Sequence, residues 1–373
     1  MQTQMSKGPA RGGVLSWLTT SLGRILISLF VPVITFLVLW RGYIFLRDSD
    51  APQAVIVLVA IIWGVGGVAL LFVVSNWLVE QLPSELARRL QPFVFIGPGV
   101  AILTWYLVVP VIRTLVLSFQ NDIGQGFVGL QNYIFALTDR VMLEAFRNNL
   151  LWMILGTSFS VGLGLLIAVL ADRSRFESVY KAIIFMPMAI SFVGAGVIWK
   201  FVYTYKGTGA GIQEIGLLNA IVLAFGGESQ PWLQIPPWNN FLLIIIMVWL
   251  QTGYAMVIIS SAIKGVPVEL LEAARIDGAN EVRAFFSITI PYIQGTLLTV
   301  TTTIVIFSLK LFDIVRVMTG GNNGTNVIAN EFYLQSFTYN QTGRASAIAI
   351  VLLIVAIPVI IYNLRQFAER RAF

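Results

Sequence analysis

Long apolar runs alternate with short polar segments along the whole chain. A helix needs about 20 mostly apolar residues to cross the hydrocarbon core of a bilayer. Eight runs have about this length: 25–46, 54–78, 93–119, 148–170, 181–203, 239–263, 296–315 and 345–362. We therefore predict an all-α integral membrane protein with eight spans, because helices satisfy their backbone polar groups internally in lipid.

A polar segment, 79–91, separates the first two runs from the other six, and we interpret it as a cytoplasmic linker. The expected organisation is as follows: a cytoplasmic segment, 1–24; two N-terminal transmembrane helices with the linker, 25–92; a six-helix core, 93–367; and a cytoplasmic tail, 368–373. A single eight-helix domain without functional division is the alternative that the sequence leaves open.

Lys and Arg residues are unevenly distributed between the segments on the two sides of the predicted spans. With the N-terminus inside, the inner segments carry 14 of them and the outer segments five. Cytoplasmic segments of membrane proteins are enriched in these residues. Both termini, and also segment 265–291, are therefore predicted to be cytoplasmic.

Segment 265–291 is the one long polar interruption in the C-terminal half, and its pattern is helical. Pro267 suits a first helical turn, where a missing N–H costs nothing. Gly278 can end a helix and Asn280 can cap the next one. We predict a helix–turn–helix that lies at the membrane surface and offers a knob to another molecule.

The composition supports a membrane protein and excludes several kinds of site. The chain is 57% hydrophobic and 11% charged, whereas soluble domains carry about 25% charged residues. It has no Cys or His, which excludes disulfides, metal sites built on those side chains, and Ser-His or Cys-His nucleophiles. We expect no bound metal, no catalytic residues and no nucleic-acid partner, since the net charge of +6 fits membrane topology.

The chain also lacks a phosphate-binding G-x-x-x-x-G-K-[ST] loop. Any ATP hydrolysis that drives this protein must therefore come from another polypeptide, and we expect no cofactor on this chain.

Lys310 and Asp313 are the most informative charges within the predicted spans. Three residues apart in one helix, they would share a face. An ionised side chain at the centre of a membrane helix costs about 2.5–3.5 kcal/mol, so the two should pair or face water. Two interpretations remain open: a pair at the outer interface, or a pair beside a substrate path.

A spaced pattern within segment 265–291 resembles the EAA loop of bacterial ABC importer permeases. It reads Glu-Ala-Ala, three residues, Gly278, nine residues, then Ile-Thr-Ile-Pro, and only Ile290 departs from the family's Leu. The resemblance implies a coupling helix that docks into a cleft on a separate ATPase. The implied coupling residues are Glu272, Ala273, Ala274, Asp277 and Gly278.

Several other signatures in 93–367 resemble the binding-protein-dependent sugar permeases, especially the alpha-glucoside branch related to the maltose permease. They are FVGLQNY (127–133), RNNLLW (147–152), FMPMAISFVGAGVIWKFVY (185–203), GLLNAIV (216–222) and LKLFDIVRVMTGG (309–321). The family's TGGGP reads TGGNN here, at 319–323, and the maltose permease's large outer insertion is missing.

This resemblance implies an importer for a small glycoside, of the alpha-glucoside, glucosylglycerol, trehalose, maltose or sucrose class, in a bacterial inner membrane. The implied partners are a second permease subunit, two copies of a cytoplasmic ATPase that binds ATP and Mg²⁺, and an extracytoplasmic solute-binding protein. We expect the second permease to be a paralogue, with a second copy of this chain as the alternative.

The sixth and seventh runs carry the expected substrate residues. Sugar pockets combine aromatic faces with a few polar groups, and the sixth run places Gln251 and Tyr254 in an otherwise apolar helix. The resemblance to the maltose permease implies substrate contacts at Met247, Leu250, Gln251, Tyr254, Phe307, Ser308 and Leu311, and we add Lys310 and Asp313. Helix–helix packing is the alternative for each residue.

An ion- or proton-coupled secondary transporter is the alternative function. The absence of His and the scarcity of acidic residues within the runs argue against it. A membrane scaffold without transport is a third possibility, and an enzyme is the least favoured because no acid–base constellation appears in the runs.

Overall fold

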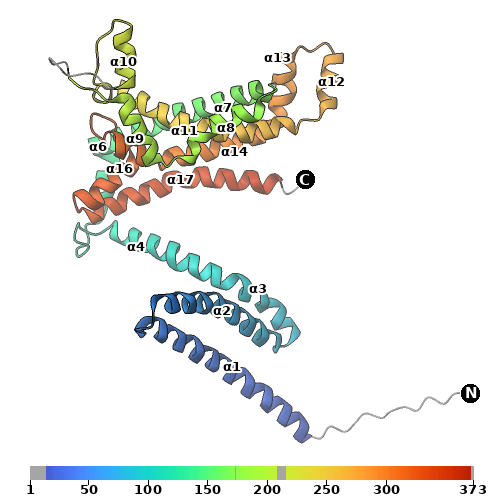
Figure 1. Ribbon diagram of the computed structural model, residues 1–373. Coiled ribbons are helices and arrows are strands. Elements are labelled where there is room, and N and C mark those ends of the chain that lie inside the picture. Colours follow the sequence, from blue (N-terminus) through green and yellow to red (C-terminus); the bar gives the residue numbers. More distant parts are fainter. Residues whose placement is uncertain (1–13, 173, 208–215, 371–373) are drawn as a thin grey trace, which may run out of the picture. The chain divides into compact units, whose positions relative to one another are not determined.

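The computed structural model describes residues 14–172, 174–207 and 216–370, and the side chains of 30–362 within these ranges. Every regular element in the described residues is a helix, which confirms the predicted all-α class (Figure 1). The chain forms two compact units, Met1–Pro110 and Val111–Phe373, which we describe separately.

The first unit contains three long helices: α1 (Val14–Asp48), α2 (Gln53–Glu80) and α3 (Ser84–Leu103), the last continued by the π-helical turn η1 (Thr104–Val108). The indole N–H of Trp63 on α2 donates to the Leu39 carbonyl of α1 at 3.1 Å. The predicted linker 79–91 is mostly helical, since only residues 81–83 lie outside helices α2 and α3, and its cytoplasmic location stays a prediction. Pro83 ends the break, since its fixed φ suits the residue before a helix.

Helix α4 (Val109–Leu117) leads into the second unit, whose elements follow in chain order. They are α5 (Gln131–Thr138), α6 (Arg140–Leu151), η2 (Trp152–Gly156), α7 (Thr157–Asp172), α8 (Glu177–Phe185), η3 (Met186–Ala189), α9 (Phe192–Tyr203), α10 (Leu217–Ala224), η4 (Trp232–Gln234), α11 (Trp238–Lys264), α12 (Val268–Ile276), α13 (Glu281–Ala284), η5 (Phe285–Thr289), α14 (Ile290–Leu309), α15 (Asp313–Met318), α16 (Ile328–Tyr333), η6 (Leu334–Thr338) and α17 (Thr342–Arg370).

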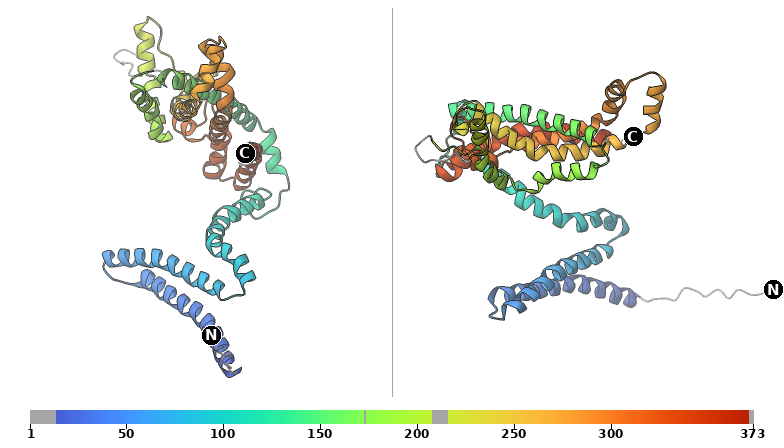
Figure 2. Two further views of the ribbon diagram at one scale, coloured as in Figure 1. Left: turned by 90° about the vertical axis from the view of Figure 1, so that its right-hand side faces the viewer. Right: turned by 45° about the horizontal axis from the view of Figure 1, so that its top comes forward.

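Helix α11 is the central element of this unit. Helix α7 packs along it, and α8, η3 and α14 contact it as well (Figures 1 and 2). Within its most apolar stretch 61% of the residues are buried, more than in any other candidate span. Helices α12 and α13 project from one end of the bundle and α10 from the other (Figure 1).

Seven helical stretches in the described residues are long and apolar enough to cross a membrane. They are Phe30–Asp48, Gln53–Glu80, Ser84–Leu117, Arg140–Asp172, Trp238–Lys264, Glu281–Leu309 and Thr342–Tyr362. Each overlaps one predicted run. The predicted fifth run, 181–203, needs a correction.

This fifth run is not one helix. Helix α8 with η3 and helix α9 meet at 101°, so an eighth span exists only as a broken pair. Pro187 lies in η3, where it removes a backbone donor and disfavours a continuous helix. The Ser191 hydroxyl then caps α9 by accepting the Gly194 N–H at 3.0 Å.

The predicted seventh run, 296–315, is also interrupted. Helix α14 ends at Leu309 and α15 begins at Asp313. The Asn149 side chain explains the break, because its amide N–H₂ donates to the Leu309 carbonyl at 3.2 Å and its oxygen accepts the Ile328 N–H at 2.8 Å. The prediction that Lys310 and Asp313 share a helix face is therefore wrong.

Asparagine amides also hold the loop 319–326, where the family's TGGGP is replaced. Asn148 donates to the carbonyls of Gly324 and Asn326, both at 2.8 Å. Asn240, at the start of α11, donates to the same Gly324 carbonyl at 2.9 Å. Side chains from two helices thus fix a loop that has little regular structure of its own.

We expect Asn149→Leu to lower the free energy of unfolding by about 1–3 kcal/mol, because it leaves buried carbonyl and N–H groups without partners. Thermal unfolding of the purified protein in detergent measures the change. Asn322→Ala is the control, since this exposed amide makes one local bond, to the Thr319 carbonyl at 2.9 Å. Equal shifts in the two variants would contradict the bridging role of Asn149.

Candidate functional site

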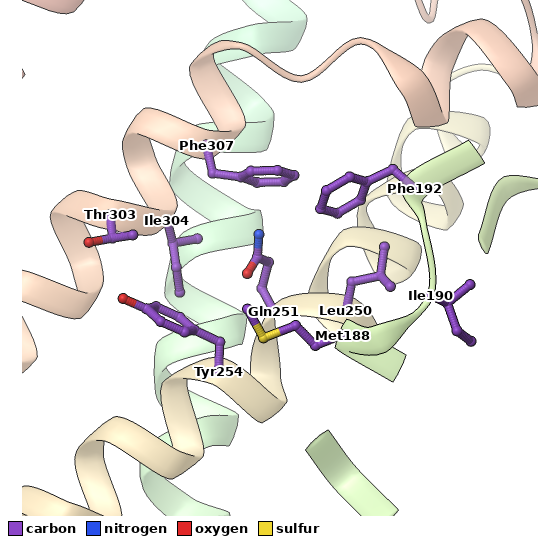
Figure 3. A pocket seen from close by; sticks show the side chains of 9 residues that line it. All are labelled: Met188, Ile190, Phe192, Leu250, Gln251, Tyr254, Thr303, Ile304 and Phe307. Atoms are coloured by element: carbon purple, nitrogen blue, oxygen red, sulfur yellow. The ribbon is translucent and has the colours of Figure 1, made fainter. Parts of the chain in front are cut away.

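A pocket of about 290 Å³ opens where three segments of the second unit meet. The bend between α8 and α9 forms one wall, the middle of α11 forms the floor, and the C-terminal half of α14 forms the opposite wall (Figure 3). Its lining residues are Met188, Ile190, Phe192, Leu250, Gln251, Tyr254, Thr303, Ile304 and Phe307.

Gln251 is the most informative of these residues. The residue is only 7% exposed, and its amide lies in the middle of the pocket, below the ring of Phe307 (Figure 3). Among the described residues it has no hydrogen-bond partner. Because the amide faces the pocket, its two N–H donors and its carbonyl oxygen are available to a ligand or to water.

Two further polar groups and an aromatic pair complete the pocket. The hydroxyl of Tyr254 extends toward Thr303 (Figure 3), and the Thr303 hydroxyl donates to the Thr299 carbonyl at 2.8 Å, which leaves its lone pairs free to accept. The rings of Phe192 and Phe307 lie 4.7 Å apart at 35° and close one side. The walls are thus apolar and aromatic, with three hydrogen-bonding groups.

This lining suits a small, uncharged ligand that has both apolar faces and hydroxyl groups. Ligand pockets are generally apolar with a few placed polar groups that set orientation. The nine lining residues include no Asp, Glu, His, Cys, Lys or Arg. The pocket can therefore bind and orient an uncharged ligand.

The predicted substrate residues fall into two groups in the structure. Leu250, Gln251, Tyr254 and Phe307 line the pocket. The others do not: Met247, Ser308 and Leu311 are buried in the protein core, Lys310 is exposed and Asp313 is half-buried. No ion pair joins Lys310 to Asp313 in the part of the chain that the structure describes. Substrate contact by these nine residues stays a prediction.

Five lining residues were not predicted: Met188, Ile190, Phe192, Thr303 and Ile304. The first three lie at the bend, which brings them beside α11 only because the chain turns by 101°. Pro187 and the capping Ser191 were the available signals for that bend. Gly253 on α11 makes the close approach possible, since a Cβ there would lie 2.5 Å from the Ile184 carbonyl oxygen.

The segment 265–291 forms the predicted helix–turn–helix, from α12 and α13. Gly278 has φ +80°, and the N–H groups of Gly278 and Ala279 donate to the carbonyls of Arg275 and Ala274 at 3.1 and 2.9 Å. These two bonds define a Schellman motif. The Asn280 side chain accepts the Arg283 N–H at 2.8 Å, as predicted for a cap.

The predicted coupling residues lie on the outside of this hairpin. Glu272, Ala273, Asp277 and Gly278 are exposed, and Ala274 is half-buried. Arg275 pairs with Glu281 across the turn, with Nη2 and Oε1 2.9 Å apart. The hairpin is thus braced internally and carries exposed carboxylates, whose coupling role stays a prediction.

The family model and the relatives found by comparison with known proteins are all membrane components of transport systems. The family model described as "Binding-protein-dependent transport system inner membrane component" matches residues 160–373. The osmoprotective compounds uptake permease protein GgtC of Synechocystis sp. is 55% identical over 273 residues, 73% of this chain and 97% of that protein. The alpha-glucoside transport system permease protein AglF of Rhizobium meliloti is 47% identical, over 76% of this chain and 84% of that protein.

Solved structures agree on the fold. The bacterial alginate ABC transporter, crystallised with an alginate pentasaccharide-bound periplasmic protein, matches with a TM-score of 0.64 at 18% identity, over 74% of this chain and 94% of that chain. A second alginate transporter structure matches with a TM-score of 0.62 at 18% identity, over 76% and 97% of the two chains. The predicted ABC importer permease fold is therefore confirmed.

We expect Gly253→Ala to destabilise the protein by about 1–3 kcal/mol, because the added methyl group overpacks the contact between α11 and α8. Thermal unfolding in detergent measures this. Gly162→Ala is the control: a Cβ at Gly162 on α7 meets nothing within 4 Å, so this change should stabilise by about 0.5–1 kcal/mol through helix propensity. A neutral Gly253→Ala would contradict the close packing.

Proposed function

Since the chain belongs to the family of binding-protein-dependent transport system inner membrane components, we propose that its pocket carries a small glycoside across the membrane. The chain is a permease subunit of an ABC sugar importer, a multi-pass protein of the inner membrane. It acts in transport and not as an enzyme. Nothing in the comparisons favours the ion- or proton-coupled secondary transporter.

The proposed substrate class is an alpha-glucoside or a glucosylglycerol-like osmoprotectant. The two relatives cited above, one named for alpha-glucoside transport and one for uptake of osmoprotective compounds, motivate the alpha-glucoside and osmoprotectant classes. The pocket is compatible with both. Gln251 is the observation that carries the proposal, because a buried amide without a protein partner fits a ligand that supplies hydroxyl groups. The rings of Phe192, Phe307 and Tyr254 offer faces for the apolar side of a sugar ring.

The remaining machinery is proposed from the family. Two copies of a cytoplasmic ATPase would hold ATP and Mg²⁺, a second permease subunit would complete the pathway, and an extracytoplasmic binding protein would deliver the glycoside. The α12–α13 hairpin would dock into the ATPase with Glu272 as its anchor, and both termini would be cytoplasmic. Coupling requires that ATP and the glycoside each favour one of two conformations.

We expect Gln251→Leu to reduce glycoside uptake about tenfold, which corresponds to about 1.4 kcal/mol of lost hydrogen bonding. The measurement is the initial uptake rate of a panel of alpha-glucosides and glucosylglycerol into proteoliposomes that contain the complex purified through a tag on this chain, with its binding protein outside. Thr252→Val is the matched control, because this neighbouring hydroxyl already donates to the Val248 carbonyl at 2.6 Å.

Uptake that persists unchanged in Gln251→Leu would refute this pocket as the substrate site. Uptake that a proton ionophore abolishes while ATP is held constant would instead support the secondary transporter.

We expect Glu272→Ala to abolish the stimulation of ATP hydrolysis by the glycoside-loaded binding protein, or to release the ATPase during purification. The lost carboxylate would remove the anchor of the hairpin. Glu269→Ala is the control, because Glu269 is an equally charged, exposed residue on α12 outside the Glu-Ala-Ala motif. If both variants keep full stimulation, the coupling role of Glu272 is refuted.

A further inference from the structure

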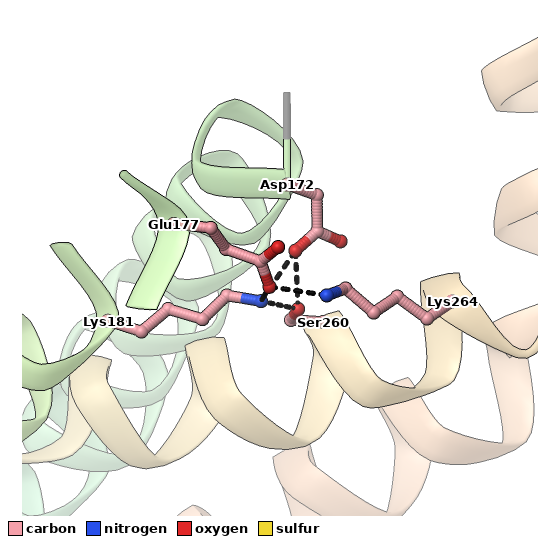
Figure 4. Close-up of polar contacts among 5 residues, drawn as sticks. All are labelled: Asp172, Glu177, Lys181, Ser260 and Lys264. Atoms are coloured by element: carbon pink, nitrogen blue, oxygen red, sulfur yellow. Dashed lines mark hydrogen bonds and ion pairs between the residues drawn. The ribbon is translucent and has the colours of Figure 1, made fainter. Parts of the chain in front are cut away.

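Five polar residues form one cluster at the end of the bundle that carries α12 and α13 (Figure 4). They are Asp172, Glu177, Lys181, Ser260 and Lys264. Asp172 is the last residue of α7, Glu177 is the first of α8 and Lys264 is the last of α11. The cluster therefore joins three helices at their ends.

The cluster has a buried side and an exposed side. On the buried side, Lys181 Nζ lies 2.5 Å from Asp172 Oδ1, and these side chains are 17% and 14% exposed. The Ser260 hydroxyl donates to the same Asp172 oxygen at 2.7 Å and also contacts Lys181. On the exposed side, Lys264 Nζ lies 2.5 Å from Glu177 Oε1, and the Lys264 side chain is 54% exposed. The same Glu177 oxygen lies 2.5 Å from Lys181 Nζ, so Glu177 links the two sides.

Helix α8 connects this cluster to the pocket. Its first turns carry Glu177 and Lys181, and η3 follows directly with Met188, which lines the pocket. Along the helix axis, Lys181 and Met188 are roughly 10 Å apart, at 1.5 Å per residue. A small rotation of α8 about its charged end would therefore move the pocket wall.

The cluster also adjoins the α12–α13 hairpin. Only 265–267 separate Lys264 from the start of α12. Asp172 borders a second cavity, of about 180 Å³, together with Arg275 and Glu281 of the hairpin. The hairpin thus meets the bundle at two places that belong to the cluster: the covalent link through Lys264 and the cavity wall at Asp172.

We propose that Lys264 and Glu177 are positioning residues that transmit movement of the α12–α13 hairpin to the pocket wall on α8. Lys264 moves with the hairpin and draws Glu177 with it, while the buried Lys181–Asp172–Ser260 contacts act as the pivot. The inference rests on the proposed function, because it assigns to the hairpin the movement that an ATPase would impose. Transmission of this kind is a coupling free energy between two sites and needs a direct measurement.

The measurement exploits the absence of cysteine from this chain. A spin label on Ala189→Cys, an exposed position beside the pocket, reports on the end of η3. In the full complex, with partner subunits prepared without cysteine, the spectrum is recorded with and without ATP and vanadate. ATP hydrolysis of the same samples reports separately on the ATPase.

We expect Lys264→Gln to reduce the nucleotide-dependent spectral change at Ala189→Cys at least about fivefold, the lower end of usual coupling factors. Lys264→Arg keeps the charge and should retain the change. Both variants should fold and keep the ATPase, because exposed ion pairs contribute little to stability. Glu177→Gln should lose at least as much of the change as Lys264→Gln, because it also removes the contact with Lys181, and the double variant should lose no more than Glu177→Gln alone.

The spectra and the ATP hydrolysis together distinguish three other outcomes. A full spectral response in Lys264→Gln and in Glu177→Gln overturns the inference and leaves the proposed function intact. Equal losses in Lys264→Arg and Lys264→Gln also overturn it, because a purely steric role would be indicated. A complex without any ATPase overturns the proposed function, and this inference falls with it.

Discussion

The rest of the bundle depends on one constraint: the free carbonyls at a buried helix end need a hydrogen-bond donor. The amide of Asn149 on α6 supplies that donor at the end of α14. A helix that ends inside a packed bundle, as α14 does at the buried Leu309, needs another group to bind its free carbonyls. Asn149 does so for Leu309, and Asn148 does so for the loop that follows α15. Outside the membrane-spanning helices, the amide of Asn219 similarly bridges the carbonyls of Thr204 and Gln230.

The Asn149 bridge at Leu309 and the Ser191 cap at the start of α9 accompany two breaks that a bundle of straight helices would not contain, and the pocket depends on both. The turn at 190–191 brings the first residues of α9 against α11. The end of α14 at Leu309 leaves Phe307 in its last turn, where its ring meets Phe192. The pocket is therefore built from helix ends and from one face of the central helix.

Position within a helix explains which parts of this site could be predicted from the sequence. Leu250, Gln251 and Tyr254 follow the period of one unbroken helix, so the sequence predicted that they share a face. The turn at Gly278 was also predicted, because a glycine that ends a helix is a local sequence pattern. The breaks were not readable in the same way. The bond between Asn149 and the Leu309 carbonyl joins residues 160 positions apart, and no local pattern encodes such a contact. Lys181 and Lys264 were explained by the enrichment of Lys and Arg in cytoplasmic segments, so nothing in the sequence indicated their partners on other helices.

The central helix connects the pocket with the hairpin. Gln251 and Lys264 are on the same continuous helix, roughly 20 Å apart at 1.5 Å per residue. Because α7 packs along α11, these two helices behave as a close-packed body that resists internal deformation, except at the last turn of α11, where Lys264 leads into the hairpin. Helix α8 differs, since it is held by charged contacts at one end and by a tight backbone contact at Gly253 near the other. A body that stays rigid beside a helix that can rotate is the arrangement through which a hairpin outside the bundle can change the shape of a pocket inside it.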